Sequence, residues 1–177
     1  MTDKQRLPGR RTSGARASGI LAELGPGLLV MDVDSTLIEQ EVIELIAEHA
    51  GTREQVADIT ERAMRGELDF AASLRQRVST LAGVNRTIFA DVLDQVRLTP
   101  GAEELIARLH ASGCRVGIVS GGFTEVVGPL ATRLGIDHMA ANRLETSEGV
   151  LTGRVEGRIV DRDVKDQCLR EWAAEDD

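Results

Sequence analysis

The chain has 177 residues, of which 42% are hydrophobic and 28% are charged, the composition of an ordinary globular domain. A formal net charge of −8 at pH 7 and an aromatic content of 2% argue against a nucleic-acid partner. No apolar run approaches the roughly 20 residues that span a bilayer, so no membrane partner is expected. The two cysteines have no metal-site spacing, which suits a reducing cytoplasm.

The N-terminal segment differs in composition from the rest of the chain. Five basic residues and a single acidic one fall within residues 1–20, among Gly, Ser, Pro and Ala. This composition predicts a basic, disordered tail over residues 1–26. No apolar segment of the signal-peptide type follows it, so a secretory signal is not expected.

Two carboxylates follow the first apolar run. The run Leu28–Met31 predicts a short, fully buried strand, and Asp32 and Asp34 leave its end with their side chains on the same side of the backbone. Ligands bind at the carboxyl ends of strands in open parallel sheets. Two acids there repel each other unless a cation or a chemical role compensates, so the pair predicts a metal-assisted reaction. The alternative is an acidic turn that caps the next helix.

Between residues 40 and 97, apolar residues recur at helical spacing. Four amphipathic helices with short connections are predicted, and together they form a small bundle. Capping residues mark several of the starts, and glycines mark stops. The predicted helices run from Val42 to Gly51, from Thr52 to about Met64, from Asp69 to Gly83, and from Asn85 onwards.

After residue 98, predicted helices alternate with β-rich runs. Residues 141–160 alternate between apolar and polar side chains around Glu148-Gly149, which is typical of a hairpin. The first helix is expected to open with Thr99 as its cap and Pro100 at its first position. The expected order is a helix to Gly113, a strand Arg115–Val119 ending at Ser120, a helix Thr124–Leu134, a strand Ile136–Met139, the hairpin, and a helix Asp161–Ala174.

This order of elements predicts an α/β fold. Strands and helices alternate on either side of a helical insert, which favours a parallel sheet with helices on both faces and the insert above the carboxyl edge. The expected division is a core of residues 27–38 and 98–177 and a helical cap of residues 39–97.

Three polar features suit phosphoryl chemistry. The hydroxyl of Ser120 and the backbone N–H groups of Gly121 and Gly122 can hold phosphate oxygens at the start of a helix. Lys165 can neutralise the charge of a phosphate and of an attacking carboxylate. Each feature alone is ordinary: a serine-glycine turn and a surface lysine.

The ordered set of motifs resembles the haloacid dehalogenase superfamily and, within it, the phosphoserine phosphatase family. The resemblance runs from about Leu28 to Glu175 and is carried by DVDSTLI, ITERAMRGELDFAASLRQRV, VSGGFT, ANRLE and LTGRVEGRIVD. It implies a Rossmann-like parallel sheet with an inserted four-helix cap and a small β-hairpin cap at residues 141–160. It also implies a cytoplasmic enzyme that hydrolyses O-phospho-L-serine in the last step of serine biosynthesis.

The resemblance also implies roles for single residues. Asp32 would be the nucleophile that forms an aspartyl-phosphate, Asp34 the general acid and base, and both would bind Mg²⁺, Asp34 through its backbone carbonyl. The substrate would be held by Ser120, Gly121 and Lys165 at its phosphate, Glu41 at its ammonium and Arg77 at its carboxylate, with Met64 and Phe70 closing over it. Taken singly, Glu41 and Arg77 are typical of solvated helix residues, and Met64 and Phe70 of a helix-bundle core.

One family motif does not occur in these 177 residues. A Gly-Asp-Gly-x-x-Asp-like motif, which would supply the third carboxylate of the metal site, is absent. The C-terminal core strands are therefore expected to be missing, which would leave the strand before Asp32 as an open edge. Alternatives to the enzyme are an impaired member that only binds phosphoamino acids or a partner, a homodimer or a chain completed by another polypeptide, a decayed remnant, and a phosphotransferase of the same superfamily.

Overall fold

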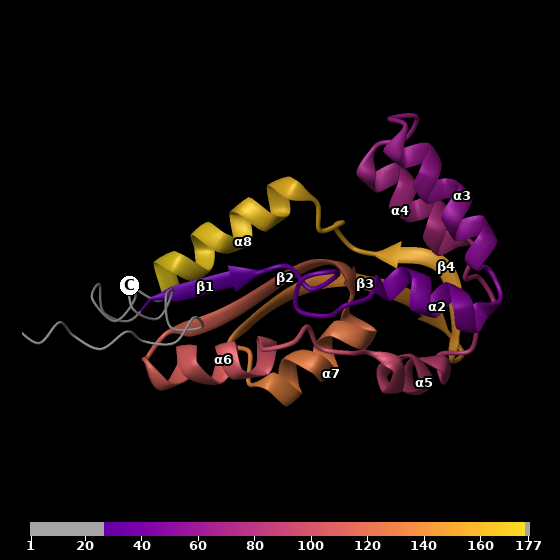
Figure 1. The fold of residues 1–177 in the computed structure, drawn as a ribbon. Coiled ribbons are helices and arrows are strands. Elements are labelled where there is room, and N and C mark those ends of the chain that lie inside the picture. The colour runs from indigo at the N-terminus through magenta and orange to yellow at the C-terminus, as the bar shows by residue number, and fades with distance from the viewer. Residues whose placement is uncertain (1–26, 176–177) are drawn as a thin grey trace, which may run out of the picture.

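Within residues 27–175, which the computed structural model describes, a four-stranded sheet organises the chain (Figure 1). The predicted tail of residues 1–26 lies outside this range. The strand order is β1-β2-β3-β4, with β1–β2 and β2–β3 parallel and β3–β4 antiparallel. The strands are β1 (Leu28–Met31), β2 (Arg115–Phe123), β3 (His138–Ser147) and β4 (Val150–Glu156).

Helices cover both faces of this sheet, as the sequence predicts. Helices α6 (Ala102–Ala111) and α7 (Thr124–Leu134) lie on one face, and α8 (Arg162–Glu175) lies across the other, against β1 and β2 (Figure 1). The predicted hairpin is present, because β3 and β4 pair around Glu148-Gly149, both of which have positive φ. None of the helices of residues 27–175 combines the length and the apolar character that a bilayer crossing requires.

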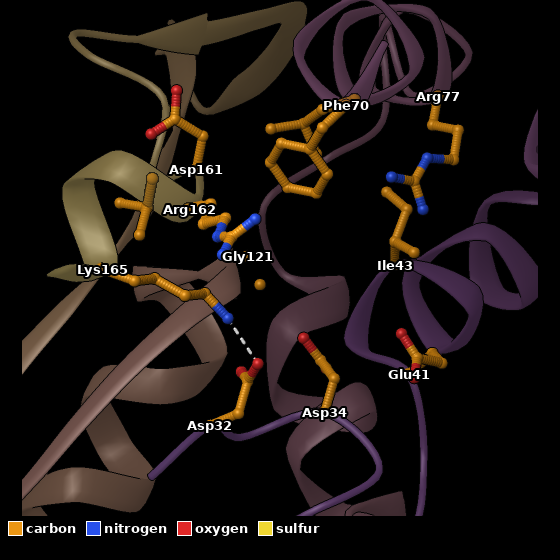
Figure 2. A pocket seen from close by; sticks show the side chains of 13 residues that line it. Asp32, Asp34, Glu41, Ile43, Phe70, Arg77, Gly121, Asp161, Arg162 and Lys165 are labelled. Atoms are coloured by element: carbon orange, nitrogen blue, oxygen red, sulfur yellow. Dashed lines mark hydrogen bonds and ion pairs between the residues drawn. The ribbon is translucent and has the colours of Figure 1, made fainter. Parts of the chain in front are cut away.

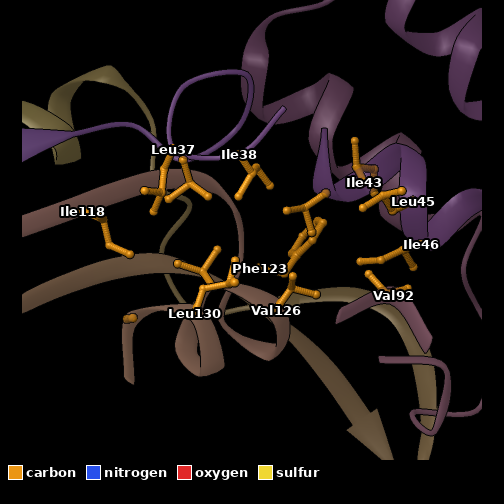
Figure 3. Packing of buried hydrophobic residues seen from close by; sticks show 14 of the residues in the cluster. Leu37, Ile38, Ile43, Leu45, Ile46, Val92, Ile118, Phe123, Val126 and Leu130 are labelled. Carbon is orange, nitrogen blue, oxygen red and sulfur yellow. The ribbon is translucent and has the colours of Figure 1, made fainter. Parts of the chain in front are cut away.

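The four helices of the insert lie in two pairs. Helices α2 (Val42–Ala50) and α5 (Ile88–Gln95) pack on each other beside the sheet, and α3 (Arg53–Met64) and α4 (Phe70–Ser79) project beyond its carboxyl edge (Figure 1). Residues of α2 and α5 share one hydrophobic cluster with β2 and α7 (Figure 3). The division into a core and a cap at residues 39–97 stays a prediction, because this cluster runs through both parts.

Three strands differ from their predicted form. We expected a short strand Ile136–Met139 separate from the hairpin, but β3 begins at His138 and runs without a break into the first hairpin arm. We expected β1 to be fully buried, but all four of its residues are only half-buried, because within residues 27–175 it pairs with β2 alone and its outer edge is open. We expected β2 to end at Ser120, but it continues to Phe123. A register shift between Val119 and Phe123 accommodates the glycine pair inside the strand.

Three helix boundaries also differ. Thr99 does not cap α6: its hydroxyl donates to the carbonyl of Thr36 (2.7 Å), and Gly101 precedes the helix at φ 86°. Asn85 does not cap α5. Its side chain accepts from the backbone N–H of Thr87 (2.9 Å), in the turn that precedes the helix. Helix α4 ends at Ser79 rather than at Gly83. Its predicted cap is present, because Asp69 accepts from the N–H of Ala72 at 2.6 Å.

Candidate active site

The chain bends sharply after β1 and presents Asp32 and Asp34 at the carboxyl edge of the sheet. Val33 between them is fully buried, and Ser35 has a left-handed φ of 51° that turns the chain. The backbone N–H of Val42, at the start of α2, donates to Asp34 Oδ1 (2.8 Å). This bond ties the first residue of the helical insert to the strand end, and it fixes the direction of the Asp34 side chain.

Both carboxylates face a pocket of about 460 Å³ at this edge (Figure 2). The sheet supplies its floor, α4 supplies one wall and the start of α8 supplies another. The predicted residues that line the pocket are Asp32, Asp34, Glu41, Phe70, Arg77, Gly121 and Lys165. Segments that are up to 133 positions apart in the sequence therefore meet in one site.

Lys165 forms an ion pair with Asp32. Lys165 lies in the first turn of α8, and its Nζ donates to Asp32 Oδ2 (Figure 2). A cation in this place compensates the charge of Asp32 and would also meet a phosphate that approaches that carboxylate. The structure thus brings Lys165 and Asp32 together, and their roles as phosphate-neutralising lysine and nucleophile stay predictions.

Asp34 is in a different electrostatic environment. Its pKa is raised from 3.8 to about 6, mainly by burial and also by the negative charges of Glu41 and Asp32, while the hydrogen bonds from Val42 and Ser120 act in the opposite direction. A carboxyl with this pKa can carry a proton near neutral pH and can also give it up. This is the property that a general acid and base requires.

The opposite wall carries a charge pair suited to an amino acid. Among residues 27–175, Arg77 Nε is one of two buried side-chain polar atoms without a hydrogen-bond partner. Burial lowers the pKa of Arg77, and the negative charges of Glu41, Asp34 and Glu44 oppose this effect. Arg77 is half-buried and lines the pocket, and its guanidinium has the planar pair of donors that can bind a carboxylate bidentately. Glu41 lines the same pocket and accepts from the Ser35 hydroxyl at 2.6 Å.

Two predicted residues do not line the pocket. Met64, at the end of α3, is 84% exposed and does not reach it. Ser120 is fully buried beneath the floor, where its hydroxyl donates to Asp34 Oδ2 (3.3 Å) and accepts from the N–H of Gly122 (2.8 Å). In this conformation Ser120 therefore orients Asp34 instead of presenting its hydroxyl to the cavity.

The two floor glycines leave room for their neighbours. A Cβ atom at Gly121 would lie 3.2 Å from the ring of Phe70, and one at Gly122 would lie 3.0 Å from Asp34 Oδ2. Phe70 therefore lies directly over Gly121, and it is Phe70 rather than Met64 that covers the floor. Larger residues at either position would displace the ring or the carboxylate.

Sequence reasoning missed several lining residues. Arg162 lies three positions before Lys165 on the same helix, a spacing that places both on one side, so it could have been found once Lys165 was assigned. Leu74, Val160 and Asp161 lie within motifs that carry the family resemblance, but no role was assigned to them. The missed residues are Ile43, Leu74, Val160, Asp161 and Arg162.

The oxygen donors at the strand end fit part of a metal site. Asp32 and Asp34 supply the hard ligands that Mg²⁺ prefers, and their mutual repulsion favours a cation between them. Among residues 27–175, however, no group of three His, Cys, Asp or Glu side chains is arranged to hold a metal. Glu41 and Asp161 line the same pocket but are not grouped with this pair, so the third family carboxylate stays unassigned among the described residues.

The raised pKa of Asp34 predicts a stability cost that depends on pH. Because the folded state binds this proton more tightly than the unfolded state, the cost is absent below about pH 4, grows as the pH rises to 6, and is constant above. Asp34→Asn should raise the free energy of unfolding at pH 8 by about 1–3 kcal/mol. The free energy of unfolding is measured by urea denaturation in the presence of EDTA. Asp58→Asn, at an exposed position on α3, serves as the control.

The gain from Asp34→Asn should shrink as the pH falls from 6 to 4, while Asp58→Asn should show no such trend. An equal stability of Asp34→Asn and the unmodified chain at pH 8 would show that the carboxylate is not under electrostatic strain.

A family comparison identifies the class of protein to which this site belongs. Residues 29–177 match the model of the haloacid dehalogenase-like hydrolases. The chain belongs to this family, in agreement with the resemblance of its motifs and with the fold.

The named relatives are more specific. A phosphoserine phosphatase of Streptococcus thermophilus is 55% identical over 149 residues, which cover 84% of this chain and 69% of the relative. Phosphoserine phosphatase SerB2 of Mycobacterium tuberculosis is 54% identical over 148 residues, 84% of this chain and 36% of the relative. A solved phospho-aspartyl intermediate analogue of phosphoserine phosphatase superposes with a TM-score of 0.78 at 40% identity, over 85% of this chain and 72% of the other.

Proposed function

We propose that this chain is a phosphoserine phosphatase, which hydrolyses O-phospho-L-serine to serine and phosphate through an aspartyl-phosphate. The observation that carries the proposal is the arrangement of charges in one pocket. Asp32 with Lys165 lies on one side and Arg77 with Glu41 on the other, which matches a phosphate at one end and an amino acid at the other. The relatives named phosphoserine phosphatase, at 54–55% identity, support the same substrate.

In the first step a carboxylate oxygen of Asp32 forms a bond to phosphorus, and the bond from phosphorus to the seryl oxygen breaks. Asp34 donates its proton to that oxygen, so serine leaves as a neutral alcohol. In the second step Asp34 removes a proton from water, whose oxygen attacks phosphorus and releases Asp32. Lys165 offsets the negative charge that gathers between the phosphate and Asp32 in both steps.

The remaining residues would bind and enclose the substrate. Arg77 would pair with its carboxylate and Glu41 would accept from its ammonium. Phe70 lies over Gly121 and would keep water from the phosphate, whereas Met64 would have to move from its exposed position to contribute. Ser120 would act through Asp34, since its hydroxyl bonds to that carboxylate.

The family further implies a divalent cation, and Mg²⁺ fits the oxygen donors of this site. Asp32 and the backbone carbonyl of Asp34 would hold it, and when bound it would neutralise phosphate charge. With only two described carboxylates, we expect the affinity of this chain for Mg²⁺ to be weak. Serine biosynthesis in the cytoplasm is the role consistent with this reaction.

Other readings are less well supported. A phosphotransferase would use the same two aspartates, and the relatives named phosphoserine phosphatase favour hydrolysis. An impaired member that only binds phosphoamino acids would keep Arg77 and Glu41 but lose turnover. Completion by a second copy or another polypeptide would involve the open edge of β1, which offers unpaired backbone groups.

A substrate series tests the proposed function. Phosphate release with Mg²⁺ should favour L-phosphoserine over phosphoethanolamine, which has the same phosphate and ammonium but lacks the carboxylate, by at least about 100-fold in kcat/KM. The difference should arise because Arg77 would be left buried and unpaired with the second compound. Equal kcat/KM values for the two compounds would indicate an unselective phosphatase and contradict the proposal.

A further inference from the structure

We propose that Trp172, far from the pocket, is a positioning residue that holds α8 on the sheet and thereby places Lys165 against Asp32. This inference rests on the proposed function only for the role of Lys165. It concerns the way in which this chain builds the phosphate side of its site.

Besides Lys165 and Trp172, helix α8 makes exposed polar contacts with its surroundings: Gln167 accepts from Arg158 at 2.8 Å, and Glu175 lies 4.0 Å from His138. None of its residues is buried, although it carries a residue that the site requires. Lys165 pairs with Asp32 at one end, but that pair is partly exposed, with 31% and 43% of the two side chains accessible. A solvent-screened ion pair contributes little to stability, too little to hold a helix of 14 residues in place.

Trp172 supplies the missing contact. Its ring is stacked on His138 of β3, with centroids 5.2 Å apart and an interplanar angle of 13°. It also covers Gly117 in the middle of β2: a Cβ atom there would lie 3.0 Å from Trp172 Cε3 and Cζ3. The absence of a side chain at Gly117 therefore makes the space in which the indole ring lies, and aromatic packing of this kind is a strong local contact.

The spacing of the two residues connects this contact to the site. Lys165 and Trp172 are seven residues apart, which is nearly two turns, so both lie on the same face of α8. Asp32 follows β1, and Gly117 belongs to the neighbouring strand β2, so the two contacts fix the helix to adjacent strands. If the Trp172 contact is lost, α8 can shift or fray, and Lys165 leaves the geometry that offsets phosphate charge.

The composition of the chain makes this proposal directly measurable. Trp172 is the single tryptophan, and Lys165 is one of two lysines, the other being Lys4. Tryptophan fluorescence therefore reports the docking of α8 alone. Acetylation of lysine by a limiting amount of an N-hydroxysuccinimide ester, followed by peptide mass spectrometry, reports the accessibility of Lys165 with Lys4 as the internal reference.

The experiment compares three variants of the full chain. Trp172→Ala should raise the labelling rate of Lys165 relative to Lys4 several-fold, and should lower kcat for L-phosphoserine by about 10-fold to 100-fold. Trp172→Phe, which keeps an aromatic ring, should restore most of both. Arg170→Ala, which removes an exposed ion pair with Asp166 on the same helix, should leave both at their original values.

Gly117→Ala tests the same contact from the sheet. Its methyl group should displace the intact indole ring, shift the tryptophan emission to longer wavelength and raise Lys165 labelling. In the Trp172→Ala background the same methyl group should have a much smaller effect on labelling, because there is no ring to displace and only Val30 Cγ2, at 3.3 Å, remains close. If Trp172→Ala does not fold, Trp172→Phe and Gly117→Ala still decide the matter.

The outcomes separate this proposal from the proposed function. Unchanged Lys165 labelling and kcat in folded Trp172→Ala and Gly117→Ala, even with a lowered melting temperature, would overturn the positioning role. A chain that releases no phosphate from L-phosphoserine, but whose Lys165 labelling responds as expected, would contradict the proposed function and leave the positioning role in place.

Discussion

Asp32→Asn is expected to lower kcat for L-phosphoserine by at least about 10⁴-fold, the scale on which loss of a covalent nucleophile acts. An amide nitrogen and its carbonyl oxygen are poor nucleophiles, so no aspartyl-phosphate can form. The substitution keeps the size of the side chain and its hydrogen bond from the N–H of Val33 (2.8 Å). Phosphate release under saturating substrate measures the loss.

A binding measurement serves as the control for this variant. Arg77 and Glu41 are untouched by Asp32→Asn, so calorimetric titration with L-phosphoserine should still detect binding. Activity of Asp32→Asn within tenfold of the unmodified chain would mean that Asp32 is not the nucleophile. Loss of binding together with loss of activity would point instead to a disrupted site.

Arg77→Met is the second change with a large expected effect. The substitution keeps an unbranched side chain of similar reach but removes the cation, so the substrate carboxylate would be buried without a partner. Removal of one member of a buried charge pair costs about 2–5 kcal/mol, which corresponds to a loss of about 30-fold to 5,000-fold in kcat/KM. We expect the loss to appear mainly as a raised KM, because Arg77 lies on the wall opposite Asp32 and Lys165.

Arg77→Lys is the matched variant. It keeps the charge but not the planar pair of donors, so it should recover only part of the lost kcat/KM. Phosphoethanolamine gives the decisive comparison: since it has no carboxylate, its kcat/KM should change little in Arg77→Met. A similar loss for both compounds would show that Arg77 supports the fold or the phosphate rather than the carboxylate of the substrate.

Much of this fold can be predicted from the spacing of apolar residues along the sequence. The stripe of Val42, Leu45 and Ile46 gives α2, Gly51 ends it in a left-handed conformation, and Thr124–Leu134 is a helix with its predicted bounds. These elements follow from local preferences that tertiary packing does not overrule. The parallel order of β1 and β2 likewise follows from the helical connection between them.

The details that sequence reasoning missed depend on contacts distant in sequence. Thr99 could cap α6, but the carbonyl of Thr36 takes its hydroxyl. Ser120 looked like a phosphate ligand, but burial turns its hydroxyl to Asp34. Burial of β1 was predicted from its apolar composition, whereas its exposure depends on how many strands pair with it. The apolar run alone carries no information on strand pairing, and only the expectation of an open edge, drawn from the missing motif, pointed to it.

In the candidate site, too, some residues can be found from sequence motifs and others only from the packed structure. Asp32, Asp34, Gly121 and Lys165 stand in motifs with a chemical reason, and they line one pocket. Arg162 and Trp172 belong to no motif, and their roles appear only when α8 is placed on the sheet. Sequence thus indicates which groups can react, and packing decides how they are held.

The most direct test of the account is the location of the phosphoryl group during turnover. A single turnover of L-phosphoserine with Mg²⁺ is quenched in acid and treated with borohydride, which reduces an acyl-phosphate to an alcohol, and the peptides are analysed by mass spectrometry. We predict that Asp32 is converted to homoserine in this chain and that Asp34→Asn shows the same product at the same position. Phosphate release with modification at another residue, or with none at Asp32, would contradict the account.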